Sequence, residues 1–299
     1  MQSLYAVESM SGEWKEGEPL EILKKKFDQS HNLLVYLVYF ITELARFSET
    51  SAHQRASKNL PTAEDLTVNT KIAGNELQWK ILEDEGFKQA IARSKPENVI
   101  DRDLVKKIYS QLIELPEYKE YTESPSRDKL NEKEIIQLIG RDLLLGNELF
   151  TSHIEDNFIN WDDDEEMMHQ LLNSYLQKPT PGFFTEFISA EKMDFAITLQ
   201  KTVIEKKEFC LDMIRPKLKN WEADRIAALD MIIIRMGICE FLYFETIPPK
   251  VTINEYIDLA KDYSTPQSGN FVNGILDNIH KELLAENKII KRSFRNSTL

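Results

Sequence analysis

The chain has little of what marks enzymes, secreted proteins and β-rich proteins. It holds two cysteines, Cys210 and Cys239, in 299 residues, and they form no CxxC pair. This favours two buried free thiols in a reducing compartment over a disulfide framework. Its eleven prolines and ten glycines are few and lie mostly between periodic segments. No convincing run of alternating hydrophobicity occurs, and Glu, Lys, Leu and Ile recur at helical spacing, so we expect an all-α fold.

Catalytic and targeting motifs are also missing. The sequence has no phosphate-cradling GxxxxGK[ST], no GxGxxG and no HExxH, and its five histidines are widely scattered. We therefore expect no catalytic residues, no cofactor and no metal site, and hence a protein that is not an enzyme. The acidic stretch at residues 161–166 is either a divalent-cation site or an exposed loop with an acidic helix start. No signal peptide is visible, which favours a cytoplasmic location.

The charge balance is strongly acidic, with a net charge of −13 and a pI of about 5.0. Broad, non-specific nucleic-acid binding depends on neutralising phosphates, so this balance disfavours it. The net negative charge does not rule out a local basic patch that binds nucleic acid.

The most apolar stretch runs over residues 226–244 and is hydrophobic on nearly every face. Its length suits a membrane span, but Asp230, Arg235 and Glu240 are spread through it, and each would cost roughly 2.5–3.5 kcal/mol in lipid. The stretch is therefore expected to be the core helix of a soluble helical domain and not a membrane segment.

Helical periodicity divides the remaining chain into segments separated by turns. Thr252 is the expected N-cap of a capping box with Glu255, and Thr265 the N-cap of the last helix, with Pro266 at its first position. Loops are expected at 116–127 and 177–182. Helices are expected at 1–10, 19–47, 63–94, 98–114, 131–151, 164–177, 191–215, 226–244, 252–262 and from 266 onward.

The last helix has two distinct faces. Its core stripe is expected to be Val272, Ile275, Leu276 and Ile279, which follow the i, i+3, i+4, i+7 pattern. Phe271 lies about 90° from that stripe at 100° per residue, so it either stacks on an exposed base or packs beneath a neighbouring helix. The polar face opposite the stripe comprises Gln267, Asn270, Gly274 and Asn278.

The end of the chain is basic. Residues 288–299 hold four basic residues and no acidic ones. This segment is either a disordered tail or a set of phosphate contacts that, with Lys281, extends the polar face.

Two motifs stand out at residues 251–261 and 268–277, above all Asn254-Glu255 and the Phe-Val-Asn-Gly run from Phe271 to Gly274. With these motifs the chain resembles the NusB family of bacterial transcription antitermination factors. Residues 234–242 and 195–218 also match, as does the Gln-x-Leu-Tyr run of residues 2–5. In all, the similarity covers about residues 1–12 and 191–285.

This resemblance implies two small helical bundles packed on each other, with a large helical region inserted. The expected parts are the first helix of the N-terminal bundle at 1–14, the insertion at 15–190, the rest of that bundle at 191–220, the C-terminal bundle at 221–285 and a basic tail at 286–299.

The resemblance also implies a role. Proteins of this family pair with the ribosomal protein NusE, bind the boxA element of nascent ribosomal RNA leaders and keep RNA polymerase resistant to termination, without catalysis. The RNA-binding positions implied here are Gln2, Tyr5, Gln267, Ser268, Asn270, Phe271 and Lys281. The partner-binding positions implied here are Tyr5, Glu222, Asp224 and Arg225.

Two departures from the family pattern leave alternatives open. The family's arginine-rich start is not present, since nothing basic precedes Lys15. Either the native chain begins upstream of Met1, which the lack of a capping residue before Met1 favours, or RNA affinity depends on other basic groups. The inserted region also has no counterpart in short family members. The alternatives are a helical protein-interaction scaffold, or an accessory to a ribosomal RNA methyltransferase, with RNA binding weakened or lost.

Overall fold

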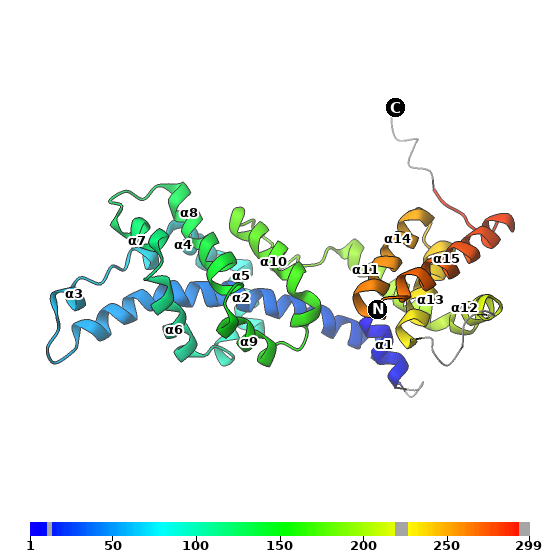
Figure 1. Cartoon of the computed structure of the whole chain (residues 1–299), viewed down its shortest axis with the longest axis horizontal. Helices are drawn as coiled ribbons and strands as arrows, with labels where there is room; N and C mark the ends of the chain where they lie inside the picture. The colour runs from blue at the N-terminus through cyan, green and yellow to red at the C-terminus, as the bar shows by residue number, and fades with distance from the viewer. Residues whose placement is uncertain (11–13, 219–226, 293–299) are drawn as a thin grey trace, which may run out of the picture. The chain divides into compact units, whose positions relative to one another are not determined.

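The computed structural model of the chain describes residues 1–10, 14–218 and 227–292. Every regular element in these ranges is helical, which confirms the predicted all-α class (Figure 1). The chain divides into two compact units. Unit 1 comprises Met1–Lys26 and Ile188–Leu299, and unit 2 comprises Phe27–Phe187. Unit 1 is thus built from two stretches that unit 2 separates in sequence.

Helix α2 (Glu18–Ala56) begins in unit 1 and continues into unit 2. The other elements of unit 1 are α1 (Gln2–Ser9), α11 (Ala190–Glu205), α12 (Lys207–Ile214), the 3₁₀-helix η4 (Arg215–Leu218), α13 (Ala228–Tyr243), α14 (Pro249–Tyr263) and α15 (Ser268–Ala285). Those of unit 2 are α3 (Ala63–Leu66), η1 (Lys71–Gly74), α4 (Glu76–Glu83), α5 (Glu85–Ser94), η2 (Pro96–Asn98), α6 (Arg102–Leu112), α7 (Pro116–Glu123), α8 (Lys129–Leu138), the π-helical η3 (Ile139–Leu144), α9 (Glu148–Asn157) and α10 (Trp161–Gln177).

Helix α13 is the core of unit 1, as the sequence predicts. It packs against α1, α11, α12, α14 and α15, and all its residues from Ile232 to Phe241 are buried. Its 16 residues are fewer than the roughly 20 that a membrane span needs. Within the described ranges, no helix combines the length and hydropathy of a membrane crossing. Cys239 of α13 and Cys210 of α12 are buried free thiols, which confirms that prediction.

The three charged side chains of α13 are buried, and each contacts a different helix. Asp230 accepts a hydrogen bond from Ser268 of α15 (2.8 Å). Arg235, 1% exposed, forms an ion pair with Glu8 of α1. Glu240 accepts a hydrogen bond from the Tyr256 hydroxyl of α14 (3.1 Å). Burial, together with the Glu240 carboxylate, raises the pKa of Tyr256, so its hydroxyl keeps the proton that it donates.

The C-terminal segment of the described chain caps α13. Lys291 Nζ donates to the carbonyl oxygens of Glu240 (2.9 Å) and Phe244 (2.7 Å). The last carbonyls of a helix lack intrahelical partners and carry partial negative charge, so an ammonium group stabilises them. Burial lowers the pKa of Lys291. Residues 286–292 are therefore docked on unit 1, and the disordered-tail alternative is wrong for them.

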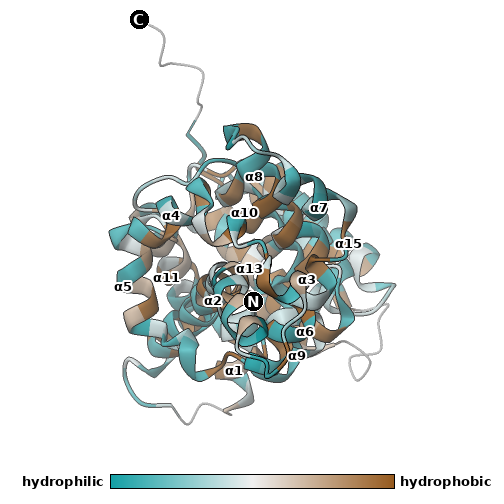
Figure 2. Cartoon of the chain, turned by 90° about the vertical axis from the view of Figure 1, so that its left-hand side faces the viewer, coloured by the Kyte–Doolittle hydropathy of each residue, from teal (hydrophilic) through white to brown (hydrophobic). Residues whose placement is uncertain are grey.

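Helix α2 is the core of unit 2. Its residues from Leu33 to Val38 are all buried, so neighbours cover the helix on every side. Figure 1 shows the shorter helices of unit 2 lying along it. These shorter helices are amphipathic, and Figure 2 shows hydrophilic and hydrophobic residues on the same helices, for example α5 and α8.

Several predicted boundaries in unit 2 are wrong because side-chain caps and buried tyrosines override the periodicity. The segment expected as one helix over 63–94 is interrupted where Asn75 caps α4 and Asp84 caps α5. The segment expected as a loop at 116–127 contains α7, because Pro116 suits a first helical position and Tyr118 and Tyr121 are buried.

In unit 1, the predicted capping box at Thr252 is wrong. Helix α14 starts three residues earlier at Pro249, with Pro248 as N-cap, so Thr252 lies inside the helix and is fully buried. Helix α15 starts at Ser268 with Gln267 as N-cap, not Thr265.

We predict that Glu8→Ala destabilises unit 1 by about 3 kcal/mol, since removing the Glu8 carboxylate leaves the buried charge of Arg235 uncompensated. Replacing both partners, as in the Glu8→Leu/Arg235→Met variant, is expected to recover much of this loss. The free energy of unfolding in urea is the measurement. As a control, Lys201→Ala breaks the exposed pair with Glu205 and should cost less than about 1 kcal/mol. Equal effects of Glu8→Ala and Lys201→Ala would contradict the structural role of the Glu8–Arg235 pair.

Candidate nucleic-acid interface

Helix α15 buries the stripe that the sequence predicts. Val272, Ile275, Leu276 and Ile279 are all 3% exposed or less. The buried face is wider than this stripe, because α15 packs against three helices, α12, α13 and α14. It therefore also includes Ser268, Gly269, Phe271 and Leu283.

Two predicted interface residues belong to that buried face. Phe271 is 4% exposed and lies in the hydrophobic core of unit 1, so of the two alternatives for this residue the structure shows the one in which it packs beneath neighbouring helices. Ser268 is 1% exposed. Its hydroxyl donates to Asp230 and accepts from the main-chain N–H of Thr265 (3.1 Å). Both side chains hold α15 in place and leave the outward face to other residues.

The outward face of α15 is rich in amides. It comprises Gln267, Asn270, Asn273, Gly274, Asn278 and Lys281, all exposed. Asn273 is absent from the sequence prediction although it lies about 60° from Asn270 at 100° per residue. A helical wheel drawn around Asn270 would have included it. We refer to these six residues as the α15 amide face.

Gly274 sits near the centre of this face with no packing reason to be glycine. A Cβ atom at this position would meet nothing within 4 Å. At Gly237 of α13, by contrast, a Cβ would come within 2.7 Å of a Leu276 methyl carbon. Asn278 Nδ2 donates to the Gly274 carbonyl oxygen (2.9 Å). The backbone of α15 is thus open at Gly274, at a position where glycine lowers helix stability by up to about 1 kcal/mol.

The basic groups near this face are paired with acidic neighbours. Lys281 bonds to Asp277 (2.6 Å) and Lys288 to Glu286 (2.7 Å). Arg292 bonds to Glu245 (2.7 Å). Arg295 lies outside the described residues. The α15 amide face consequently offers hydrogen-bond donors and acceptors more than net positive charge.

Helix α1 supplies the other predicted interface residues. Tyr5 is 47% exposed, and Gln2 is half-buried. Helix α1 packs on α11 and α13 and is joined to α13 by the Glu8–Arg235 pair. Helices α1 and α15 are therefore both fixed to the same core helix. The predicted partner positions Glu222, Asp224 and Arg225 lie outside the described residues.

Comparison with known proteins identifies the family to which this chain belongs. The NusB family model matches residues 152–281. A transcription antitermination protein NusB from Dictyoglomus thermophilum is 35% identical over 134 residues, which cover 45% of this chain and 92% of that protein. The chain belongs to the NusB family.

Other NusB proteins match over shorter segments. The protein from Salinibacter ruber is 43% identical over 98 residues, 33% of this chain and 61% of that relative. The protein from Methylacidiphilum infernorum is 49% identical over 82 residues, 27% of this chain and 57% of that relative. The chain thus spans about three fifths of these two NusB relatives. Both are named as transcription antitermination proteins. No solved structure matched.

The NusB match and the two units do not share boundaries. The matched range begins at residue 152, inside α9 of unit 2, and ends within α15 of unit 1. It includes α11 to α14 and most of α15, and it does not include α1. The NusB-like character of residues 1–12 thus stays a prediction.

We predict that Phe271→Ala destabilises unit 1 by about 3–5 kcal/mol, because it leaves a cavity in the core. The neighbouring Asn270→Ala is exposed and should change stability by less than about 0.5 kcal/mol. Urea unfolding followed by circular dichroism measures both. A Phe271 variant as stable as the Asn270 variant would mean that Phe271 is not a core residue.

Proposed function

We propose that this chain is a non-enzymatic, RNA-binding transcription antitermination factor. It acts in the bacterial cytoplasm with the ribosomal protein NusE, binds boxA-type RNA in ribosomal RNA leaders and promotes read-through by RNA polymerase. Membership of the NusB family and the names of the relatives support this role.

The observation that carries the RNA-binding part is the α15 amide face with Gly274 at its centre. Single-stranded RNA is read through the edges of unstacked bases, and side-chain amides can both donate to and accept from those edges. A bare backbone at Gly274 lets a base or ribose approach the helix more closely than a Cβ atom would permit.

The proposed RNA contacts are revised from the sequence expectation. Gln267, Asn270 and Lys281 contact RNA from α15, and Gln2 and Tyr5 contact it from α1. Ser268 and Phe271 are not proposed as RNA contacts. They hold α15 in position, Ser268 through its hydrogen bond to Asp230 and Phe271 through packing in the core. NusE binds near Tyr5 and the segment containing Glu222, Asp224 and Arg225.

We also propose a domain arrangement. Unit 1 is a NusB-type domain, and unit 2 is a helical region inserted into it between α1 and α11. The discontinuity of unit 1 in the sequence supports this arrangement.

A gel-shift assay tests the function. The full chain with NusE is expected to bind an RNA carrying a boxA-type element at low salt. The double variant Gln267→Ala/Asn270→Ala should bind at least about tenfold more weakly, because two hydrogen bonds contribute about 1–3 kcal/mol. The control Asn131→Ala/Gln170→Ala makes the same chemical changes on exposed helix faces of unit 2 and should leave binding unchanged. No RNA binding by the wild-type pair would refute the proposal.

Gly274→Ala separates recognition from folding. It should stabilise unit 1 by about 0.5–1 kcal/mol, because alanine is the better helix former and its methyl group meets nothing in the protein. The same methyl group should weaken RNA binding if RNA approaches the backbone there. Stability is measured in urea and affinity by gel shift. A variant that is stabilised but binds RNA as tightly as wild type would place the RNA elsewhere.

A protein-interaction scaffold is the second candidate function. Unit 2 exposes apolar side chains that favour it, namely Trp79 (52% exposed) and Ile159 (79% exposed). Under this alternative the chain binds protein partners through unit 2, and the gel shift shows no RNA complex.

A further inference from the structure

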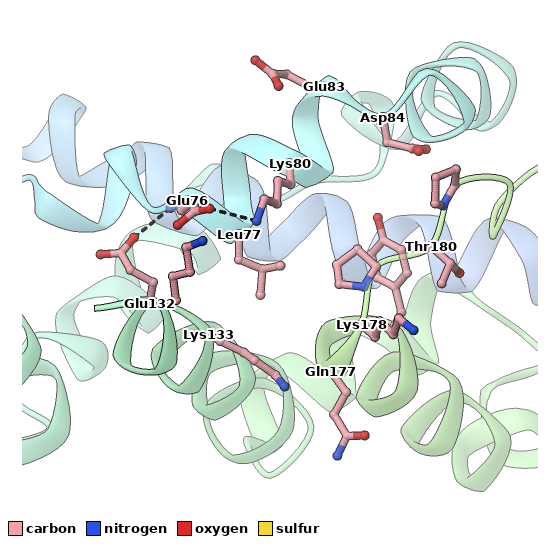
Figure 3. A pocket seen from close by; sticks show the side chains of 14 residues that line it. Glu76, Leu77, Lys80, Glu83, Asp84, Glu132, Lys133, Gln177, Lys178 and Thr180 are labelled. Carbon is pink, nitrogen blue, oxygen red and sulfur yellow. Dashed lines mark hydrogen bonds and ion pairs between the residues drawn. The ribbon is translucent and has the colours of Figure 1, made fainter. Parts of the chain in front are cut away.

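Unit 2 contains a cavity of about 560 Å³, and none of the proposed RNA contacts is among its lining residues. Helices α4, α8 and the end of α10 form its walls, together with the segment that follows α10 (Figure 3). Leu77, Pro179 and Pro181 give it apolar surface. Its volume lies within the roughly 300–1,000 Å³ typical of small-molecule sites.

The cavity is lined by lysines whose charges are available. Lys129 and Lys133 come from α8, and Lys178 follows α10. None of the three forms an ion pair within the part of the chain that the structure describes, whereas Lys80 of the same lining is bonded to Glu76 (2.9 Å). In Figure 3, Lys133 extends from α8 toward the Gln177 end of α10.

The acidic residues of the lining compensate only part of the positive charge of these lysines. Glu132 is held by the main-chain N–H of Glu76 (2.7 Å), the Tyr121 hydroxyl (2.9 Å) and Arg127. Asp84 caps α5 by accepting from the Phe87 N–H (2.6 Å). Figure 3 shows Glu83 directed away from the cavity. Glu76 is paired with Lys80, whereas Asp84 keeps its negative charge, so Lys129, Lys133 and Lys178 outnumber the carboxylate that remains without a cationic partner in the wall.

An unpaired donor in the wall points to a ligand independently of the lysines. Tyr175 is 2% exposed, and its ring packs on Phe183 and Phe184 with centroid distances of 4.6 and 4.9 Å. Its hydroxyl has no hydrogen-bond partner among the described residues. Burial, with the Asp84 carboxylate, raises the pKa of Tyr175, so the hydroxyl stays protonated. Buried polar groups in native proteins are nearly always paired with a protein group or an ordered water, so this hydroxyl is available to donate to a ligand oxygen.

We propose that this cavity binds a small organic anion bearing phosphate or carboxylate groups, with Lys129, Lys133 and Lys178 as its cationic contacts and the Tyr175 hydroxyl as a neutral donor. Tyr175 is itself one of the residues that line the cavity, and its hydroxyl has no hydrogen-bond partner among the described residues. The net charge of the chain is −13, so the binding of an anion depends on local clusters of basic groups such as this one.

Titration calorimetry of the full chain tests the proposal, with inorganic pyrophosphate and citrate as separate probes for phosphate and carboxylate. At least one probe is expected to bind at millimolar concentration or below, and the probe that binds identifies the chemistry. Lys133→Met and Tyr175→Phe should each raise its Kd about tenfold. Lys107→Met, an exposed lysine of α6 outside the cavity, should leave the Kd unchanged.

Thermal unfolding without any anion tests whether the Tyr175→Phe variant keeps the stability of the wild-type protein. Tyr175→Phe should melt no lower than wild type, because it removes a hydroxyl that has no partner. A lower melting temperature would show that the hydroxyl is bonded within the protein and would overturn the proposal. It would be overturned equally by the absence of binding for both probes, or by binding that Lys133→Met and Tyr175→Phe leave unchanged.

Discussion

The fold of unit 1 depends on pairing three charged groups inside an apolar helix, of which Asp230 is paired through Oδ2 while its Oδ1 has no partner among the described residues. Asp230, Arg235 and Glu240 lie five residues apart on α13, so successive side chains point about 140° from one another around the helix axis. Each meets a polar group on a different helix, α15, α1 and α14 respectively. A buried charge without a partner costs several kcal/mol. An alternative packing of these helices that breaks the pairs therefore costs free energy for each unpaired charge, in addition to the free energy of the lost apolar contacts.

This constraint connects folding to the proposed function. The helices that carry the proposed RNA contacts, α1 and α15, lie near opposite ends of the sequence. Both are nevertheless fixed to α13 by polar bonds to its buried side chains. The buried side chains of Phe271 and Ser268 hold α15 against its neighbours. The outward face of α15 then presents amide side chains and, at Gly274, a backbone without a side chain. Because the nearby lysines are paired with acidic neighbours, this face is better suited to hydrogen bonding with base edges than to bulk electrostatic attraction.

The core helices can be predicted from the sequence. Features that depend on contacts between helices, such as the burial of Phe271 and the capping of α13 by Lys291, cannot. The all-round apolar pattern of α13 and the stripe at Val272–Ile279 identify buried helices without any knowledge of packing. The burial of Phe271 depends on α15 touching three helices, which the pattern of one helix does not contain. Likewise, no sequence signal marks Lys291 as the cap of α13, since that contact joins residues 47 to 51 positions apart. Unit 2 and its cavity have no motif at all, and only the folded arrangement brings Lys129, Lys133, Lys178 and Tyr175 together.

The central claim is that RNA binds the outward face of α15 as α13 positions it. The most direct measurement is photo-crosslinking of the full chain with NusE to a 4-thiouridine-substituted boxA-type RNA, followed by mass-spectrometric mapping of the crosslinked peptides. The account predicts crosslinks in the peptide that contains Gln267, Asn270 and Gly274, with further crosslinks at α1 near Tyr5. Crosslinks confined to unit 2 would contradict it.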